Sequence, residues 1–333
     1  MSENHFDSLS AEQRENARSA LVGAFGRAPI EAITPIAGGA STASTFRIDT
    51  GDRRYLLRVE GEPSPLRNPH QYVSMRIAAE AGIAPKIRYI DETGRTAVID
   101  FIAQRPLSTY PGGPNALAQA LGELLSRVQA TPVFPSFVNY PDIVARLFAH
   151  VRRTGLFAAG VLDPHVARLE RLHQAYDAGL TGLVSSHNDS IPSNILFDGE
   201  RLWLIDWESA YRNDPLVDVA IVLDSLVRSP EPQGVLLRAW LGRVPDEAIY
   251  ARLDLVRAFT RLYYAGVVLS ASAAASWVTG DTDLSAPTVD GFQQAIRAGR
   301  LKHGAPETKH ILGKMFLASF MSGGDTPRFD AAV

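Results

Sequence analysis

Residues 185–219 contain the side chains that are best suited to chemistry in this chain. The segment begins with the spacing His187-x-Asp189-x4-Asn194, and an apolar run further on ends in Asp206. Carboxylate and amide oxygens are hard ligands that suit Mg²⁺. A loop carboxylate beside them can accept a proton from a substrate hydroxyl. This order of residue types therefore indicates transfer of a phosphoryl group from a nucleotide to an alcohol.

The stretch between Asn194 and Asp206 predicts a β-hairpin. Two apolar runs, residues 195–197 and 202–205, flank an Asp-Gly dipeptide, which is a strong signal for a tight turn. Asn194 lies just before the first strand, and Asp206 lies at the end of the second. An antiparallel pair brings these two ends together, so an amide oxygen and a carboxylate are expected to converge on one metal ion.

Each polar residue of this segment has an expected role. We expect Asp189 to orient the acceptor hydroxyl and take its proton, and Asn194 and Asp206 to hold Mg²⁺ against the phosphates. His187 should brace the loop without reacting. Two alternatives stay open, namely a loop hydrogen-bond pair followed by an ordinary strand end, and a zinc site. The zinc site would use His187, Asp189 and Asp206, but no second His stands at ligand spacing.

The elements that must position these residues fall into two parts. Alternating runs predict strands over residues 32–36, 45–49, 53–60, 86–91 and 96–102, with helices over 8–26 and 69–82. A Pro- and Gly-rich stretch follows at residues 106–114. Beyond it, helices are predicted over residues 115–130, 141–153, 163–178, 214–228, 233–242, 246–277, 288–301 and 306–321. The predicted fold class is α+β, with two lobes. Residues 1–103 are expected to form a nucleotide-binding lobe with a small antiparallel sheet and one inserted helix. Residues 104–333 are expected to form a larger, mainly helical lobe for catalysis and substrate binding.

Composition excludes several classes of protein. The 333 residues include no Cys, which rules out disulfides and Cys-based zinc sites, and the formal net charge of -3 implies no general attraction to nucleic acid or anionic membranes. The polar N-terminus lacks an apolar signal core. Residues 265–278 are apolar but short and contain three serines, so they predict a buried helix and not a membrane span. We expect a cytoplasmic enzyme whose oligomeric state the sequence does not predict.

The central segment also resembles a known superfamily. HNDSIPSNILFDG followed by LWLIDWESAYRNDPLVDVA is similar to the aminoglycoside phosphotransferase and choline kinase superfamily, most of all its choline/ethanolamine kinase branch. AGGASTASTFRI resembles the nucleotide loop of that superfamily, YLLRV its cation-bearing strand, and AGIAPKIRYIDE and VIDFIAQRPL the approach to its hinge. The resemblance extends over about residues 33–228. It implies a protein-kinase-like two-lobe fold with ATP and Mg²⁺ as cofactors.

The resemblance assigns a set of residues to the nucleotide. They are Gly38, Gly39, Ser41 and Thr42 of the loop, Arg58 of the third strand, and Asp100 and Ile102 at the hinge. Arg58 stands where the superfamily has Lys or Arg, and residues 1–85 contain no Lys. Alternation along the strand puts Arg58 on the face opposite Tyr55, Leu57 and Val59, so we expect it to point toward the phosphates and not into the core.

The predicted helix over residues 69–82 departs from the kinase pattern. Kinases pair the strand cation with a Glu of this helix. Here the helix holds a single acid, Glu80, near its end, and His70 and Gln71 stand about where an acid is expected. Another group must therefore hold Arg58, or the lobe must rearrange on binding.

The acceptor is expected to be a small-molecule alcohol, and family analogy indicates an amino alcohol such as choline or ethanolamine. Glu208, Tyr264 and Trp277, with Tyr263 beside them, could hold an ammonium group through a carboxylate and aromatic faces. The same aromatic residues could simply pack helices, and Glu208 could be a second metal contact or only a surface acid. Aminoglycosides, thiamine and other alcohols stay open. So do two other classes, a non-catalytic nucleotide-binding protein and a metal-dependent hydrolase.

Overall fold

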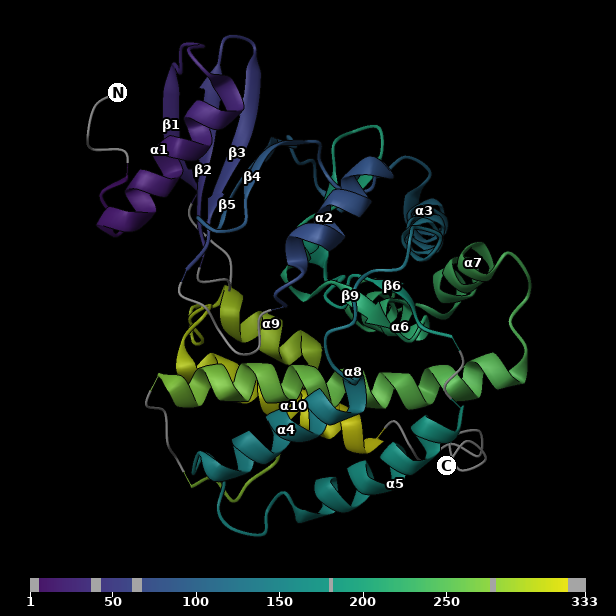
Figure 1. Cartoon of the computed structure of the whole chain (residues 1–333). Coiled ribbons are helices and arrows are strands. Elements are labelled where there is room, and N and C mark those ends of the chain that lie inside the picture. The colour runs from purple at the N-terminus through teal and green to yellow at the C-terminus, as the bar shows by residue number, and fades with distance from the viewer. Residues whose placement is uncertain (1–5, 37–42, 62–67, 180–181, 276–279, 323–333) are drawn as a thin grey trace. The chain divides into compact units, whose positions relative to one another are not determined.

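The computed structural model describes residues 6–36, 43–61, 68–179, 182–275 and 280–322 (Figure 1). The chain divides into two compact units. The first unit comprises residues 1–137, 184–212 and 225–242, and the second comprises residues 138–183, 213–224 and 243–333. The predicted α+β class, a sheet-bearing N-terminal region followed by a mainly helical part, is confirmed. The lobe bounds 1–103 and 104–333 stay a prediction.

A five-stranded antiparallel sheet forms the start of the first unit. Its strands are β1 (Ala32–Ile36), β2 (Ser44–Thr50), β3 (Arg53–Val59), β4 (Ile87–Asp91) and β5 (Thr96–Asp100), in the order β1-β2-β3-β5-β4. Helix α1 (Ala11–Phe25) lies along this sheet (Figure 1). Side chains alternate along β3, so that Tyr55, Leu57 and Val59 enter the core with Phe46 and Leu21. The predicted alternation of side chains along β3 is therefore confirmed, and Arg58 lies on the opposite face.

The rest of the first unit is made of short strands and helices. Its elements are α2 (Gln71–Glu80), η2 (Leu107–Thr109), α3 (Gly113–Gln129), β6 (Val184–Ser186), η3 (Pro192–Asn194), β7 (Ile195–Phe197), β8 (Leu202–Leu204), η4 (Trp207–Ser209), β9 (Tyr211–Asn213, whose last residue belongs to the second unit) and α7 (Pro230–Leu241). Helices α3 and α7 pack tightly at Gly122, where any Cβ would overlap the backbone of Leu236. The helix pair thus depends on a glycine at this position.

The second unit is helical. It contains α4 (Tyr140–Arg153), α5 (Asp163–Gly179), α6 (Leu216–Ser225, except its last residue), α8 (Glu247–Ala274), α9 (Val289–Arg297) and α10 (Pro306–Ser322). Helix α8 begins at the N-cap Asp246, whose side chain accepts a hydrogen bond from the Ile249 N–H. It packs against α4, α5 and α10 (Figure 1). Two glycines permit the close approach, Gly266 against Leu147 and Gly313 against Leu269.

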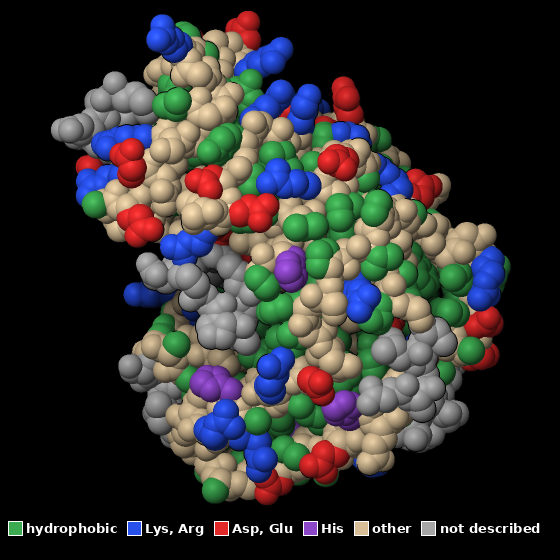
Figure 2. Space-filling model, viewed as in Figure 1, with side chains coloured by type: hydrophobic (Ala, Val, Ile, Leu, Met, Phe, Trp, Pro, Cys, Tyr) green, Lys and Arg blue, Asp and Glu red, His purple; other side chains and the backbone are tan. Residues whose placement is uncertain are grey.

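The surface mixes charges of both signs. On the face drawn in Figure 2, Lys and Arg side chains alternate with Asp and Glu side chains. This distribution agrees with the small formal net charge of -3. Among the described residues, no helix is both long enough and apolar enough to cross a membrane.

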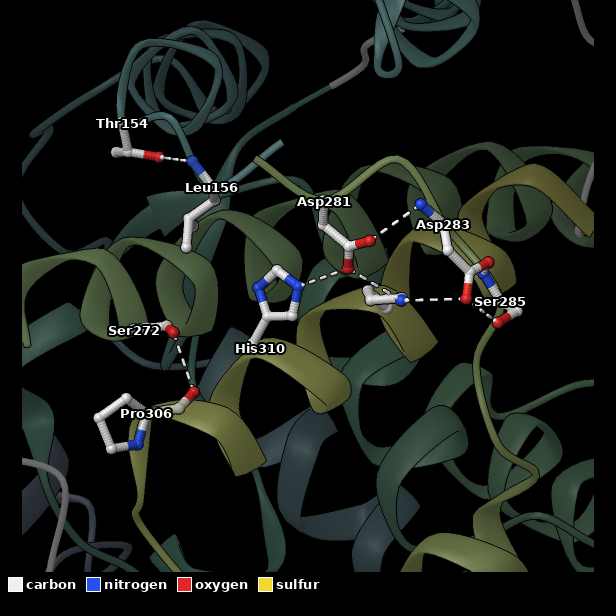
Figure 3. A network of polar contacts seen from close by, with 9 residues as sticks. Thr154, Leu156, Ser272, Asp281, Asp283, Ser285, Pro306 and His310 are labelled. Atoms are coloured by element: carbon white, nitrogen blue, oxygen red, sulfur yellow. Dashed lines mark hydrogen bonds and ion pairs between the residues drawn. The ribbon is translucent and has the colours of Figure 1, made fainter. Parts of the chain in front are cut away.

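A polar cluster ties α10 to the segment that precedes α9 (Figure 3). The Asp281 carboxylate accepts hydrogen bonds from His310 Nε2 at 3.0 Å and Lys314 Nζ at 3.1 Å, and a second oxygen accepts the Asp283 N–H at 2.9 Å. The His310 ring stacks on Phe157. Burial raises the pKa of Asp281, but these three donors outweigh it and lower the pKa to about 2. Asp281 is therefore ionised and bonded at neutral pH.

Replacing Asp281 by Asn should destabilise the protein in a pH-dependent way. A carboxylate whose pKa is lowered in the folded state adds stability above its ordinary pKa of about 3.9, and this stability is lost as the pH falls toward 2. Near neutral pH, Asp281→Asn should lower the free energy of unfolding by about 1 to 3 kcal/mol. Urea unfolding followed by Trp fluorescence measures the difference. The difference in unfolding free energy between the wild type and the variant should shrink below about pH 4. A difference that does not change with pH would contradict this explanation. The exposed Asp290→Asn is the control.

Candidate active site

The hairpin predicted between Asn194 and Asp206 is present. Strands β7 and β8 pair antiparallel, with Ile195 opposite Leu204 and Phe197 opposite Leu202. The Ile205 N–H donates to the Asn194 carbonyl at 3.0 Å, which joins the two ends of the hairpin. The backbone therefore brings the start of β7 beside the residue before Asp206, as the spacing predicted.

Asp189 and Asn194 are in direct contact within the preceding loop. Asn194 Nδ2 donates to the Asp189 carboxylate at 2.8 Å and to the Asp189 carbonyl at 2.9 Å. This bond sets the orientation of the Asp189 side chain. Because the Asn194 amide donates through its nitrogen, its oxygen is the atom that can bind a cation. The roles of proton acceptor and metal ligand stay predictions.

His187 has the contacts of a bracing residue. Its ring is fully buried, its Nε2 lies 2.9 Å from the Ile205 carbonyl oxygen, and it meets the Trp207 ring edge-on at 4.7 Å. Trp207 in turn packs edge-on against Phe134. The histidine thus holds the residues on both sides of Asp206 against the loop that bears Asp189.

Two residues of this region have positive φ although they are not glycines. Asp206 has φ of 65° and Asn188 has φ of 61°. Asn and Asp tolerate the left-handed region better than most residues, at some cost in strain. At Asp206 this conformation ends β8 abruptly and turns the chain into η4. Such strained residues are common at functional sites.

Sequence reasoning missed the role of Asn188. Its buried side-chain amide donates to the Ser209 carbonyl at 2.9 Å and to the Tyr211 carbonyl at 3.1 Å. These bonds fasten the Asp189 loop to the segment that follows Asp206. The residue type alone was a weak signal for this role. Asn adopts positive φ more readily than most residues, but this property does not indicate which distant carbonyls its side chain bonds.

Arg58 lies among three carboxylates. Its Nε donates to Glu60 Oε1 at 2.7 Å, and its Nη2 lies 3.0 Å from Asp206 Oδ1 and 2.9 Å from Glu208 Oε2. Burial lowers the pKa of Arg58, but Asp206, Glu60 and Glu208 outweigh it and hold the pKa above its ordinary value. The guanidinium therefore stays charged. Strand β3 and the loop after β8, far apart in sequence, meet at this side chain.

Glu60 is the second residue that sequence reasoning missed. Its side chain is 1% exposed and bonds Arg58 directly. A signal was available, since residues two apart on a strand share a face and Glu60 follows Arg58 by two. The kinase pattern pointed instead to a partner on the inserted helix.

The remaining predicted residues lie outside this cluster or outside the described residues. Asp100 forms a two-bond ion pair with Arg88 at 2.6 and 3.0 Å, and Ile102 follows the end of β5. Tyr264 packs in the second unit, stacked on Phe316 and edge-on to Tyr263. The other predicted residues lie outside the described residues: Gly38, Gly39, Ser41, Thr42 and Trp277.

The zinc alternative gains no support. Within the part of the chain that the structure describes, no group of three or more His, Cys, Asp or Glu side chains is placed to hold a metal ion. An amide and carboxylate pair from Asn194 and Asp206 suits Mg²⁺ better, because this ion usually takes one or two protein ligands and keeps water and phosphate oxygens as the others.

Asn188 provides a test of how the loop is held. Asn188→Ala should lower the free energy of unfolding by about 2 to 3 kcal/mol, because the backbone carbonyls of Ser209 and Tyr211 lose a hydrogen-bond donor. Asn188→Gly loses the same bonds but relieves the backbone, so its loss should be smaller. Thermal and urea unfolding measure both variants. A glycine variant less stable than the alanine variant would contradict the assigned backbone conformation.

Known proteins share both the sequence pattern and the fold. The phosphotransferase enzyme family (APH) matches the chain over residues 32–255. Protein LicA of Haemophilus influenzae is 41% identical over 57 residues, which span 17% of this chain and 21% of that protein. A solved choline/ethanolamine kinase family protein from Mesorhizobium loti has a TM-score of 0.68 at 22% identity, covering 96% of this chain and 97% of its own.

A second solved structure, choline kinase LicA from Streptococcus pneumoniae, has a TM-score of 0.63 at 14% identity and covers 86% of this chain and 98% of its own. At these identities the two structures establish the fold alone, and it is the predicted kinase-like one. The match to the family extends over more than half of the chain and confirms the resemblance found in the central segment. The chain therefore belongs to the phosphotransferase enzyme family.

Proposed function

We propose that this protein transfers the γ-phosphate of ATP to a hydroxyl of a small amino alcohol, with Mg²⁺ as cofactor. One observation carries the proposal, namely that Arg58 of β3 and Asp206 after β8 meet at 3.0 Å. The hairpin that ends at Asp206 begins at Asn194, which contacts Asp189 at 2.8 Å. A phosphate-binding cation, a metal ligand and a candidate base are thus linked through one strand pair and one loop.

Asp189 acts on the acceptor in this proposal. Its carboxylate, oriented by Asn194, accepts the proton of the acceptor hydroxyl as the hydroxyl oxygen forms a bond to the γ-phosphorus. The bond from this phosphorus to the oxygen that bridges the β- and γ-phosphates breaks, and ADP leaves with that electron pair. The products are a phosphate monoester and ADP.

Asn194 and Asp206 are the proposed ligands of Mg²⁺, and Arg58 is the proposed contact of the phosphates. When bound, the metal ion neutralises charge on the phosphate oxygens. The resemblance adds Gly38, Gly39, Ser41 and Thr42 as nucleotide-loop residues. Asp100 and Ile102 are proposed to lie beside the nucleotide at the hinge.

The acceptor class rests on relatives. The names choline kinase and choline/ethanolamine kinase family belong to structures that share this fold. Tyr264 and Trp277 remain proposed contacts for an ammonium group through their aromatic faces. Glu208 is bonded to Arg58 at 2.9 Å, so a contact with the acceptor would have to share this carboxylate. Aminoglycoside and thiamine acceptors are the competing outcomes of the test.

A screen for ADP release tests the function. The purified protein is incubated with ATP and Mg²⁺ and with choline, ethanolamine, thiamine, homoserine or an aminoglycoside in turn. We expect acceptor-dependent ADP release with choline or ethanolamine, and mass spectrometry should detect the phosphomonoester. Nucleotide binding without turnover across the panel would favour a non-catalytic protein. Ester or phosphate hydrolysis without ATP would favour a hydrolase.

Asp189→Ala should remove turnover and spare nucleotide binding. Loss of a general base lowers kcat by about 100- to 10,000-fold, whereas Arg58 and the metal ligands remain. Steady-state kinetics with the acceptor found in the screen and calorimetry with ATP and Mg²⁺ give the two quantities. Asp52→Ala, in the exposed turn between β2 and β3, is the matched control. Near-normal kcat in Asp189→Ala would remove this residue from the mechanism.

A further inference from the structure

Helix α2 does not supply the carboxylate that kinases place beside the strand cation. Its single acid, Glu80, is exposed at the end of the helix. The polar side chains of this region bind backbone instead, since Asn68 Nδ2 and Ser74 Oγ both donate to the Ala210 carbonyl, the latter at 2.8 Å. Helix α2 therefore holds the backbone that follows Asp206, and it leaves Arg58 to other partners.

The three carboxylates around Arg58 are not equivalent. The Glu60 side chain is 1% exposed, whereas those of Asp206 and Glu208 are 22% and 30% exposed. Asp206 is also the proposed metal ligand. Glu60 bonds the Nε of Arg58, and the two other acids meet its Nη2. A guanidinium is planar, so a bond at Nε fixes the plane in which Nη2 points toward the hairpin.

Glu60 is itself held on both sides through its backbone. Its N–H donates to the Arg95 carbonyl at 3.0 Å, and its carbonyl accepts Gln13 Nε2 at 3.1 Å. Gln13 belongs to the capping box of α1, where its Oε1 accepts the Ser10 N–H and its own N–H donates to Ser10 Oγ. The start of α1 and the loop before β5 thus fix the residue that bonds Arg58.

We propose that Glu60 is the positioning residue of Arg58 and takes over the role that a helix glutamate performs in other kinases. The inference rests on the proposed function, because it assumes that Arg58 contacts the phosphates. In this arrangement cation and acid lie two residues apart, at the end of one strand, and α1 secures them through the backbone of Glu60. Movement of α2 therefore does not break the pair.

A competing explanation treats Glu60 as a simple negative charge. Such a charge near the phosphates would repel an anionic nucleotide, and its removal would strengthen binding. A positioning residue has the opposite effect, because an unrestrained guanidinium must be ordered when the nucleotide binds. The two explanations thus differ in the sign of the change in nucleotide affinity.

The test uses the imido analogue AMPPNP with Mg²⁺, whose binding is measured by calorimetry and requires no acceptor. The variants are Glu60→Gln, Arg58→Met and the double variant, with Glu60→Asp as a variant that keeps the charge and shortens the side chain. Glu80→Gln, the single acid of α2, is the matched control. Thermal unfolding of each variant reports on folding, and kcat and KM for ATP are measured wherever the wild type turns over.

We expect Glu60→Gln and Arg58→Met each to weaken AMPPNP binding by about tenfold, the size typical of one charge-assisted hydrogen bond. The double variant should bind no more weakly than either single variant, because Glu60 acts through Arg58. Glu60→Asp should be intermediate, and Glu80→Gln should match the wild type. If Glu60→Gln does not fold, Glu60→Asp replaces it. The AMPPNP affinities of Glu60→Asp, Arg58→Met and the double variant Arg58→Met/Glu60→Asp then show whether the two residues act together.

Two results would overturn the inference without touching the proposed function. One is unchanged or tighter AMPPNP binding in Glu60→Gln, and the other is a double variant whose loss is the full sum of the single losses. Conversely, coupled losses in a protein that phosphorylates no acceptor would overturn the proposed function and support the inference. A wild type that binds no AMPPNP would overturn both.

Discussion

The contact between Arg58 and its three carboxylates is the interaction on which the candidate site depends. It joins β3 to the loop after β8, two segments about 150 residues apart in the chain. A buried guanidinium is costly to desolvate, so it must have acidic partners in good geometry. Glu60, Asp206 and Glu208 meet this requirement. The ion pairs of Arg58 therefore hold the sheet and the hairpin of the first unit together.

Around these ion pairs, hydrogen bonds to backbone carbonyls fix the loops. Asn188 binds the carbonyls of Ser209 and Tyr211, His187 lies on that of Ile205, and Ser74 binds that of Ala210. The carbonyls of Ile205, Ser209 and Ala210 lie in the irregular segment between β8 and β9, where strand pairing does not reach, and that of Tyr211 lies at the start of β9. The polar side chains thus supply the hydrogen bonds to the backbone that strand pairing supplies in a sheet. The strained backbone of Asp206 is tolerated because its surroundings hold it.

The second unit is built by a different principle. Its helices pack through apolar faces and small residues, such as Gly266 of α8 against α4 and Gly313 of α10 against α8. One of its polar clusters, around Asp281, joins α10 to the segment before α9 and so has a structural explanation. The aromatic pair Tyr263 and Tyr264 also has packing partners in this unit, which leaves its contact with an acceptor as a proposal.

The sequence by itself determined the features that depend on local pattern. Period-two alternation predicted β3 and the face of Arg58, and an Asp-Gly turn between two apolar runs predicted the hairpin from Asn194 to Asp206. The resemblance of the central segment to a known superfamily predicted the family. Tertiary structure alone decided the distant partners, which are Asp206 and Glu208 at Arg58 and the carbonyls bound by Asn188. The physical reason is that periodicity encodes which way a side chain points, whereas contacts between distant segments depend on how the whole chain packs.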